Sequence, residues 1–344
     1  MTQTIAKPQT ARDSWYDNAK AILILSVVIG HLATGDISPE RDWVNSFGKF
    51  IYFFHMPVFM MISGRFSRGR VDRKEYGKAV VHLLIPYLIL QTGMILLYSA
   101  MDIKTSGFSY LSPLFGLWYL FVLFLYSVIS PQLCRFRFLF PVSILAAIAA
   151  AFLPSPLFGG FQRAVMFYPF FLFGYYTSSC SFAFCKKVWF RCISVLFFAA
   201  LLLFMMFFGT SLRMDLFTLK TVIADIDGSN HWLIALEYLL HYAGSFVCFF
   251  AIMGISPTRK TFFSYVGVYS VYVYALHLFF IVWLRYVTPA IPLPGKGWVL
   301  LYLAAGIPLT LLLASKPVRR IFRPFIEPKV NFQRLLETLP LKQK

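Results

Sequence analysis

Residues 190–209 read FRCISVLFFAALLLFMMFFG, and the 18 residues from position 192 onward carry no charge. At about 1.5 Å per residue, an apolar helix of about 20 residues crosses the roughly 30 Å hydrocarbon core of a bilayer. Similar apolar runs recur along the chain, at 21–35, 47–65, 79–101, 113–130, 137–153, 161–179, 232–254, 266–284 and 297–314. The sequence therefore predicts an all-α fold, a polytopic membrane helix bundle of about ten transmembrane helices.

The composition supports a membrane protein over a soluble one. Hydrophobic residues make up 59% of the 344 residues and charged residues only 13%, against about 25% in soluble domains. The net charge of +18 could suggest a nucleic-acid partner, but the basic residues lie in short segments between apolar runs. Such segments orient membrane helices and attract anionic lipid. We therefore expect membrane lipid as a partner and no nucleic acid.

The distribution of Lys and Arg predicts the topology. With the N-terminus inside, 24 of the 32 fall in cytoplasmic segments, so an even number of spans places both termini in the cytoplasm. We expect no signal peptide and divide the chain into a cytoplasmic segment (1–20), a transmembrane domain (21–314) and a basic tail (315–344), partly an amphipathic helix. The longest external loop, 210–231, carries Asp215, Asp225 and Asp227.

The five cysteines do not form a metal-binding pattern. They show no Cys-x-x-Cys spacing and no nearby histidine pair, and most fall in or beside segments predicted to be cytoplasmic, where thiols stay reduced. They are Cys134, Cys180, Cys185, Cys192 and Cys248. We expect neither a disulfide nor a bound metal.

Three histidines fall at a similar depth in three separate apolar runs. His31 lies about 16 Å beyond Lys20 along its helix, His55 about 12 Å below the outer boundary, and His277 about 20 Å above the inner boundary. Each could simply hydrogen-bond a neighbouring helix and hold the bundle together. Because imidazole titrates near neutral pH, however, three at one depth favour a functional cavity with proton transfer.

Helical spacing extends this pattern. Lys20 and His31 are three turns apart and share one face, with the cation at the cytoplasmic end. Ser270, Tyr274 and His277, at i, i+4 and i+7, form a polar stripe on an otherwise apolar helix, which could line a channel. Glu237 and His241 form an i, i+4 pair that could also line a channel or be a simple interhelical hydrogen bond.

A strongly basic segment follows the second apolar run. Residues 65–78, RFSRGRVDRKEYGK, carry six Lys and Arg and are expected to form an inner loop. Topology and lipid contact are sufficient to explain such a loop. Clustered arginines such as Arg65 and Arg68 would also suit the docking of a phosphorylated donor, and Gly64 beside them would allow close backbone approach.

Two N-terminal motifs resemble a known family. YDNAKAILILSVVIGHL (16–32) is similar to the first-span signature of the membrane acyltransferase-3 family, a basic residue and a histidine separated by ten residues, with Lys20 where Arg is commoner. FFHMPVFMMISGRF (53–66) resembles the second-span motif, with Arg65 where an apolar residue is usual. Weaker similarities occur at 117–126, 163–176 and 266–277. The fucose 4-O-acetylase-like branch is the most similar.

This resemblance implies an enzyme of the bacterial cytoplasmic membrane that moves an acyl group, usually acetyl, from cytoplasmic acetyl-CoA to a glycan hydroxyl. It implies no permanently bound cofactor and an acceptor that is a cell-envelope glycan or a lipid-linked glycan. We expect His31 to act as general base or acyl carrier, with His55 as a second imidazole. Lys20, Arg65 and Arg68 would bind the donor. His277, Tyr274 and Ser270 would line the acceptor side, and Arg163 would hold a glycan oxygen or an acidic sugar.

Two other functions compete with this interpretation. A proton-coupled carrier or flippase for a lipid-linked sugar would use the histidines as a proton relay. A structural scaffold would leave three histidines at one depth unexplained. The order and spacing of the two motifs favour the enzyme, and the sequence carries no prediction of oligomeric state.

Overall fold

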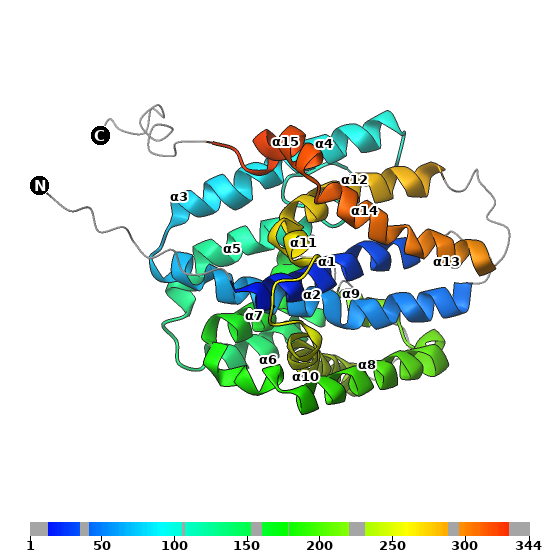
Figure 1. Cartoon of the computed structure of the whole chain (residues 1–344). Coiled ribbons are helices and arrows are strands. Elements are labelled where there is room, and N and C mark those ends of the chain that lie inside the picture. The colour runs from blue at the N-terminus through cyan, green and yellow to red at the C-terminus, as the bar shows by residue number, and fades with distance from the viewer. Residues whose placement is uncertain are drawn as a thin grey trace, which may run out of the picture.

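The structure, a computed structural model, describes residues 13–34, 41–104, 107–152, 160–177, 179–219, 231–287 and 296–329. Every regular element in these ranges is a helix, and the long helices pack beside one another (Figure 1). In chain order they are α1 (Ser14–Ala33), α2 (Arg41–Asp72), α3 (Tyr76–Ala79), η1 (Val80–Leu84), α4 (Ile85–Ala100), α5 (Trp118–Leu133), α6 (Leu139–Ala151), α7 (Gly160–Tyr176), η2 (Ser179–Lys186), α8 (Val188–Phe208), η3 (Gly209–Ser211), α9 (Met214–Thr218), α10 (His231–Ile255), α11 (Ser264–Val268), α12 (Ser270–Val287), α13 (Lys296–Ala304), α14 (Gly306–Leu313) and α15 (Lys316–Ile326). The all-α prediction is confirmed for this part of the chain.

Apolar surface on the outside of the bundle marks an integral membrane protein. Helix α8 is the clearest case, since Val188, Leu196 and Phe207 are 72%, 69% and 76% exposed. A continuous face of this kind is stable against lipid tails and not against water. Among the described residues, four helices are long and apolar enough to cross a membrane, or five if the bent pair 298–313 and 316–326 is one span. The ten predicted runs all coincide largely with helices, while the count of ten spans and the cytoplasmic termini stay predictions.

The basic segment 65–78 is mostly helical, which corrects the predicted inner loop. Helix α2 continues past the apolar run to Asp72, and a turn follows in which Lys74 adopts φ +53°. Arg and Lys are good helix formers, so the change from apolar to basic residues ends the lipid-compatible stretch without ending the helix. Arg65 and Arg68 therefore lie on the last turns of α2.

Two predicted runs are broken helices. The run 266–284 is divided at Tyr269 into α11 and α12, and the run 297–314 is divided at Ala305 into α13 and α14. The first break lets α11 pack on α1 while α12 carries His277 to the middle of the bundle. The external segment 210–231 is also not wholly a loop, because it contains the end of η3 and all of α9; Asp225 and Asp227 lie outside the described residues.

The basic tail begins with the expected amphipathic helix. Helix α15 bends by 72° from the preceding α13–α14 segment, and the guanidinium of Arg319 lies 3.3 Å from the ring centroid of Tyr269. Its apolar residue Ile326 is buried, whereas Arg320 and Arg323 face outward. This arrangement agrees with a helix that lies across the end of the bundle.

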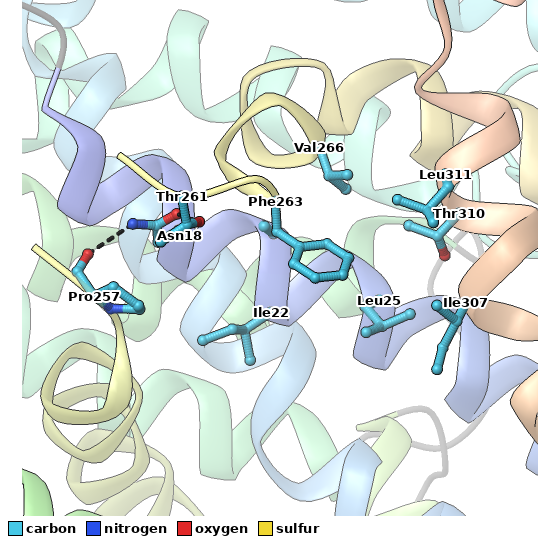
Figure 2. A pocket seen from close by; sticks show the side chains of 11 residues that line it. Asn18, Ile22, Leu25, Pro257, Thr261, Phe263, Val266, Ile307, Thr310 and Leu311 are labelled. Atoms are coloured by element: carbon cyan, nitrogen blue, oxygen red, sulfur yellow. Dashed lines mark hydrogen bonds between the residues drawn. The ribbon is translucent and has the colours of Figure 1, made fainter. Parts of the chain in front are cut away.

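A single buried side chain, Asn18, ties the start of α1 to the turn after α10. Its amide nitrogen donates to the carbonyls of Pro257 (2.7 Å) and Arg259 (2.8 Å), and its oxygen accepts from the hydroxyls of Thr261 (2.8 Å) and Ser264 (2.7 Å). Figure 2 shows Asn18 at one end of an apolar groove of about 300 Å³. The groove runs between α1, this turn and α14, and among the described residues no histidine lines it.

We expect Asn18→Ala to destabilise the fold. The variant leaves buried carbonyl and hydroxyl groups without partners, and we expect a loss of about 2–4 kcal/mol in the free energy of unfolding. Denaturant unfolding of the purified protein in detergent micelles measures this loss, with the exposed Asn45→Ala as control. Equal stability of the two variants would contradict the assignment of Asn18 as the link.

Candidate active site

Three histidines from three helices meet inside the bundle. The ring centroids of His31 (α1) and His277 (α12) lie 5.4 Å apart. His55 (α2) joins them through Tyr52, whose ring centroid is 4.6 Å from that of His55 and 5.8 Å from that of His31. His55 and His277 are buried, while His31 is partly accessible. The three histidines that the sequence predicts at one depth in the membrane therefore also meet in one site.

Two of the imidazoles have a defined tautomer. Nδ1 of His55 lies 2.8 Å from the carbonyl oxygen of Ile51, and Nδ1 of His277 lies 2.8 Å from that of Val273. A carbonyl oxygen only accepts, so each Nδ1 carries the proton and each Nε2 keeps its lone pair. Nε2 of His277 is buried without a hydrogen-bond partner among the described residues. Both rings are therefore set to accept a proton at Nε2.

His31 is held by a network that sequence reasoning missed. Its Nδ1 lies 2.9 Å from the hydroxyl of Tyr52. Arg285 donates to the hydroxyl of Thr34 (3.0 Å) and to the carbonyl oxygen of His31 (2.9 Å). The network fixes both the backbone and the ring of His31. Its signal in the sequence is weak: Tyr52 stands three residues before His55, and Thr34 stands three after His31.

We expect Tyr52→Phe to lower the rate of the predicted acyl transfer by about tenfold. The ring remains in place, but His31 loses the hydrogen bond that orients it, which is worth about 1.4 kcal/mol in the transition state. Steady-state transfer assays check this value. The matched control is Tyr242→Phe, which removes a buried tyrosine hydroxyl bonded to the carbonyl of Met166 (2.7 Å) and leaves the histidines untouched. Equal turnover of both variants would mean that Tyr52 does not act through His31.

The polar stripe of α12 is present, and its middle member borders the histidines. The Tyr274 ring centroid lies 6.3 Å from that of His277, and its hydroxyl donates to the carbonyl of Gly116 (2.6 Å). Ser270 is the first residue of α12 and is partly exposed.

Ser63 of α2 hydrogen-bonds the hydroxyl of Tyr119 on α5, in keeping with a residue that joins helices.

Arg163 lies against the start of α5. It belongs to α7, and its guanidinium lies 5.0 Å from the ring centroid of Trp118, the first residue of α5. The turn before α5 carries Phe115, whose ring centroid lies 4.9 Å from that of His31. The role of Arg163 beside the acceptor stays a prediction.

The Glu237–His241 pair does not join the cluster. His241 is buried against Phe53 and Phe217, with ring centroids 5.1 and 6.0 Å away, and Glu237 is exposed. Neither ring nitrogen of His241 has a hydrogen-bond partner among the described residues, so the pair is not a hydrogen bond there. Spacing of i, i+4 was insufficient to predict a shared site, since Glu237 is exposed while His241 is buried.

The cations expected to bind the donor lie near the other end of α1. Nζ of Lys20 is 2.7 Å from a carboxylate oxygen of Asp17, and Arg65 donates to the carbonyl oxygen of Thr177 (2.9 Å) at the end of α7. Arg68 is half exposed and pairs with Asp72 at 3.7 Å. Lys20 and Arg65 therefore have close protein partners, and the contact of Arg68 with its partner is the longest of the three.

The far end of the basic segment is also partly neutralised. The Glu75 carboxylate accepts from Arg73 (3.0 Å) and Lys78 (2.7 Å). The hydrogen bond from Arg73, followed by that from Lys78, lowers the pKa of Glu75 to about 2. Glu75 is therefore ionised at neutral pH, and the positive field of the segment comes from its remaining basic residues.

The arrangement suits proton transfer more than metal chemistry. Across the described ranges, no group of three or more His, Cys, Asp or Glu is placed to hold a metal ion. What the site offers is a partly accessible imidazole, two further imidazoles with free Nε2 atoms, and two arginines at its edge. These are the groups of a general acid–base site.

The chain is similar to known proteins over part of its length. The chain is 34% identical over 159 residues to the nodulation protein NolL of Mesorhizobium japonicum, covering 42% of this chain and 43% of that protein. It is 45% identical over 83 residues to NolL of Sinorhizobium fredii, covering 22% and 23%. The alignments thus span less than half the length of either relative. No solved structure matches.

The family assignment rests on most of the chain. Residues 13–315 match the family described as the acyltransferase domain, a range that begins at the cap of α1 and includes all three clustered histidines. The resemblance of the first two motifs to the membrane acyltransferases is thereby confirmed. The chain belongs to the acyltransferase-3 family.

Proposed function

We propose that this protein transfers an acetyl group from cytoplasmic acetyl-CoA to a hydroxyl of a cell-envelope or exported glycan. The observation that carries the proposal is the contact between His31 and Tyr52, in a cluster where two further imidazoles keep free Nε2 atoms. An acyl transfer to a hydroxyl needs a base for the hydroxyl proton, and the cluster supplies one inside an acyltransferase fold.

In the proposed reaction His31 is the general base. Its imidazole takes the proton of the acceptor hydroxyl as that oxygen attacks the carbonyl carbon of the thioester. The tetrahedral intermediate then breaks its C–S bond, and the CoA sulfur takes the proton from the imidazolium as it leaves. A route through an acyl-histidine uses the same ring as nucleophile, with His55 or His277 as base at Nε2.

The donor is proposed to enter at the Lys20 end of α1. His31 lies eleven residues further on, about 16 Å along the helix. Arg68 is the most available of the three candidate cations, since an exposed ion pair such as Arg68–Asp72 is worth little and exchanges readily for a phosphate. Lys20 and Arg65 would act mainly by holding the ends of α1 and α7 beside the donor.

The acceptor and the compartment follow from the same proposal. The helices span a membrane, and the site lies between two groups of basic residues. We propose a bacterial cytoplasmic membrane, with the donor inside and the glycan or lipid-linked glycan outside. The similar proteins are named for nodulation, which is consistent with a role at the cell surface. The fucose 4-O-acetylase-like branch is the one we propose.

Reconstitution tests this function directly. The purified full chain in sealed liposomes is given acetyl-CoA labelled in the acetyl group, together with an envelope glycan extract, and the glycans are analysed by mass spectrometry. We expect an increase of one acetyl group per modified sugar and release of free CoA. Movement of a lipid-linked sugar driven by a proton gradient, without label transfer, would instead identify a carrier.

A further inference from the structure

The turn before α5 has an unusual backbone. Phe115 adopts φ +48°, a left-handed conformation that bulky side chains rarely occupy. The next residue, Gly116, is packed so closely on α12 that an added Cβ would lie 2.5 Å from a Leu278 methyl carbon, and its carbonyl accepts from Tyr274. A strained turn that the surroundings hold in place is often a functional feature.

This turn supports two arginines from different helices. The guanidinium of Arg285 lies 5.0 Å from the ring centroid of Phe115, and that of Arg163 lies 5.0 Å from the ring centroid of Trp118. The Phe115 ring also lies 4.9 Å from the ring of His31. Two cations are thus held on aromatic faces of one turn, and its Phe115 borders the histidine cluster.

Neither arginine has a negative partner in the part of the chain that the structure describes. The ion pairs there involve other residues, and the contacts of Arg285 are to a carbonyl oxygen, a hydroxyl and a ring. Nε of Arg285 is buried without a hydrogen-bond partner, as is Nε2 of His277. Cations within a membrane protein normally pair with an anion, and aromatic faces compensate only part of the charge.

The two arginines lie apart from the basic residues that are proposed to bind the donor. Thr34, which binds Arg285, is fourteen residues beyond Lys20, or about 21 Å along α1. His31 lies only three residues from Thr34. An anion held by Arg163 and Arg285 would therefore lie beside the reacting group, on the side away from Lys20 and Arg65.

We propose that Arg163 and Arg285, held by the turn at Phe115–Trp118, bind a phosphate or carboxylate group of the glycan acceptor. The planar guanidinium fork matches the oxygens of both groups. This inference rests on the proposed function, because it states that the glycan acceptor carries a negatively charged group. A phosphate would belong to a lipid-phosphate-linked sugar, and a carboxylate would belong to an acidic sugar.

Three sugars that differ in one group test the site. Glucose, glucuronate and glucose 1-phosphate are titrated against the purified full chain in detergent without donor, and binding is measured from the rise in the unfolding midpoint. We expect one charged probe to bind at least tenfold more tightly than glucose. In Arg163→Gln its Kd should rise about 10–100-fold, whereas Arg213→Gln, the same charge change elsewhere on the external side, should leave it unchanged.

The outcomes separate the sources of the anion. Preference for glucose 1-phosphate supports a phosphate-linked acceptor, and preference for glucuronate supports an acidic sugar. Equal binding of all three probes, or loss of charged-probe binding in Arg213→Gln, would overturn the proposal. So would competition between the charged probe and CoA, since the site would then belong to the donor. If Arg163→Gln fails to fold, Arg163→Lys keeps the charge and should weaken binding less.

Binding without donor also separates this inference from the proposed function. A wild-type protein that binds a charged probe but transfers no label from acetyl-CoA would reject acetyl transfer and keep the anion site. A protein that transfers label but binds the three probes equally would support acetyl transfer and reject the anion site.

Discussion

Replacing His31 by alanine is expected to reduce acyl transfer by about 10²–10⁴-fold, the range that a positioned general base contributes. His31 is the partly accessible member of the cluster, and both its ring and its backbone are held by the network of Tyr52, Thr34 and Arg285. The other two imidazoles are buried and bonded to their own helices. Loss of His31 therefore removes the base that a substrate can reach.

The measurement is transfer of labelled acetyl from acetyl-CoA at saturating donor, made on variant protein shown to be inserted and folded in detergent. His241→Phe is the matched control, since it removes a buried histidine that packs on Phe53 outside the cluster and fills the space with a ring. We expect near wild-type turnover from the control. Transfer at wild-type rate by His31→Ala would reject the assignment of His31.

The common depth of the histidines could be predicted because it depends only on helix geometry. A rise of about 1.5 Å per residue, counted from the boundaries of the apolar runs, places His31, His55 and His277 at one level whatever the packing. The contact between His31 and His277 at 5.4 Å agrees with this estimate. The Glu237–His241 pair was predicted from i, i+4 spacing alone, which does not fix what surrounds a side chain, and His241 lies against Phe53 outside the cluster.

The supporting residues could not be predicted for a different reason. Arg285 belongs to none of the sequence motifs, and only the packing of α12 against α1 brings it to the backbone of His31. Phe115 is one aromatic among 39 phenylalanines, and a positive φ at a residue other than glycine leaves no mark in the sequence. The extent of α2 was missed because its end is set by helix propensity and not by hydrophobicity.

The second large effect is expected where α2 crosses α7. An alanine in place of a helical glycine normally stabilises a helix by about 0.5–1 kcal/mol. At Gly64 the sign should reverse, because an added Cβ would lie 2.0 Å from the carbonyl oxygen of Phe171. The same crossing brings Gly174 of α7 against α2, where a Cβ would lie 1.7 Å from the carbonyl oxygen of Met61. Small residues on both helices are what allow the two backbones to touch.

Gly64→Ala is therefore expected to lower the free energy of unfolding by more than about 3 kcal/mol, since backbone atoms on both helices must move to relieve the overlap. Gly69→Ala in the same helix provides the control, because there a Cβ meets only the end of the Arg73 side chain at 3.3 Å. Denaturant unfolding in detergent should show opposite signs for the two variants. Equal stabilities would mean that α2 and α7 do not cross at Gly64. Because α2 also carries Tyr52 and His55, separating the helices should reduce acyl transfer in parallel with stability.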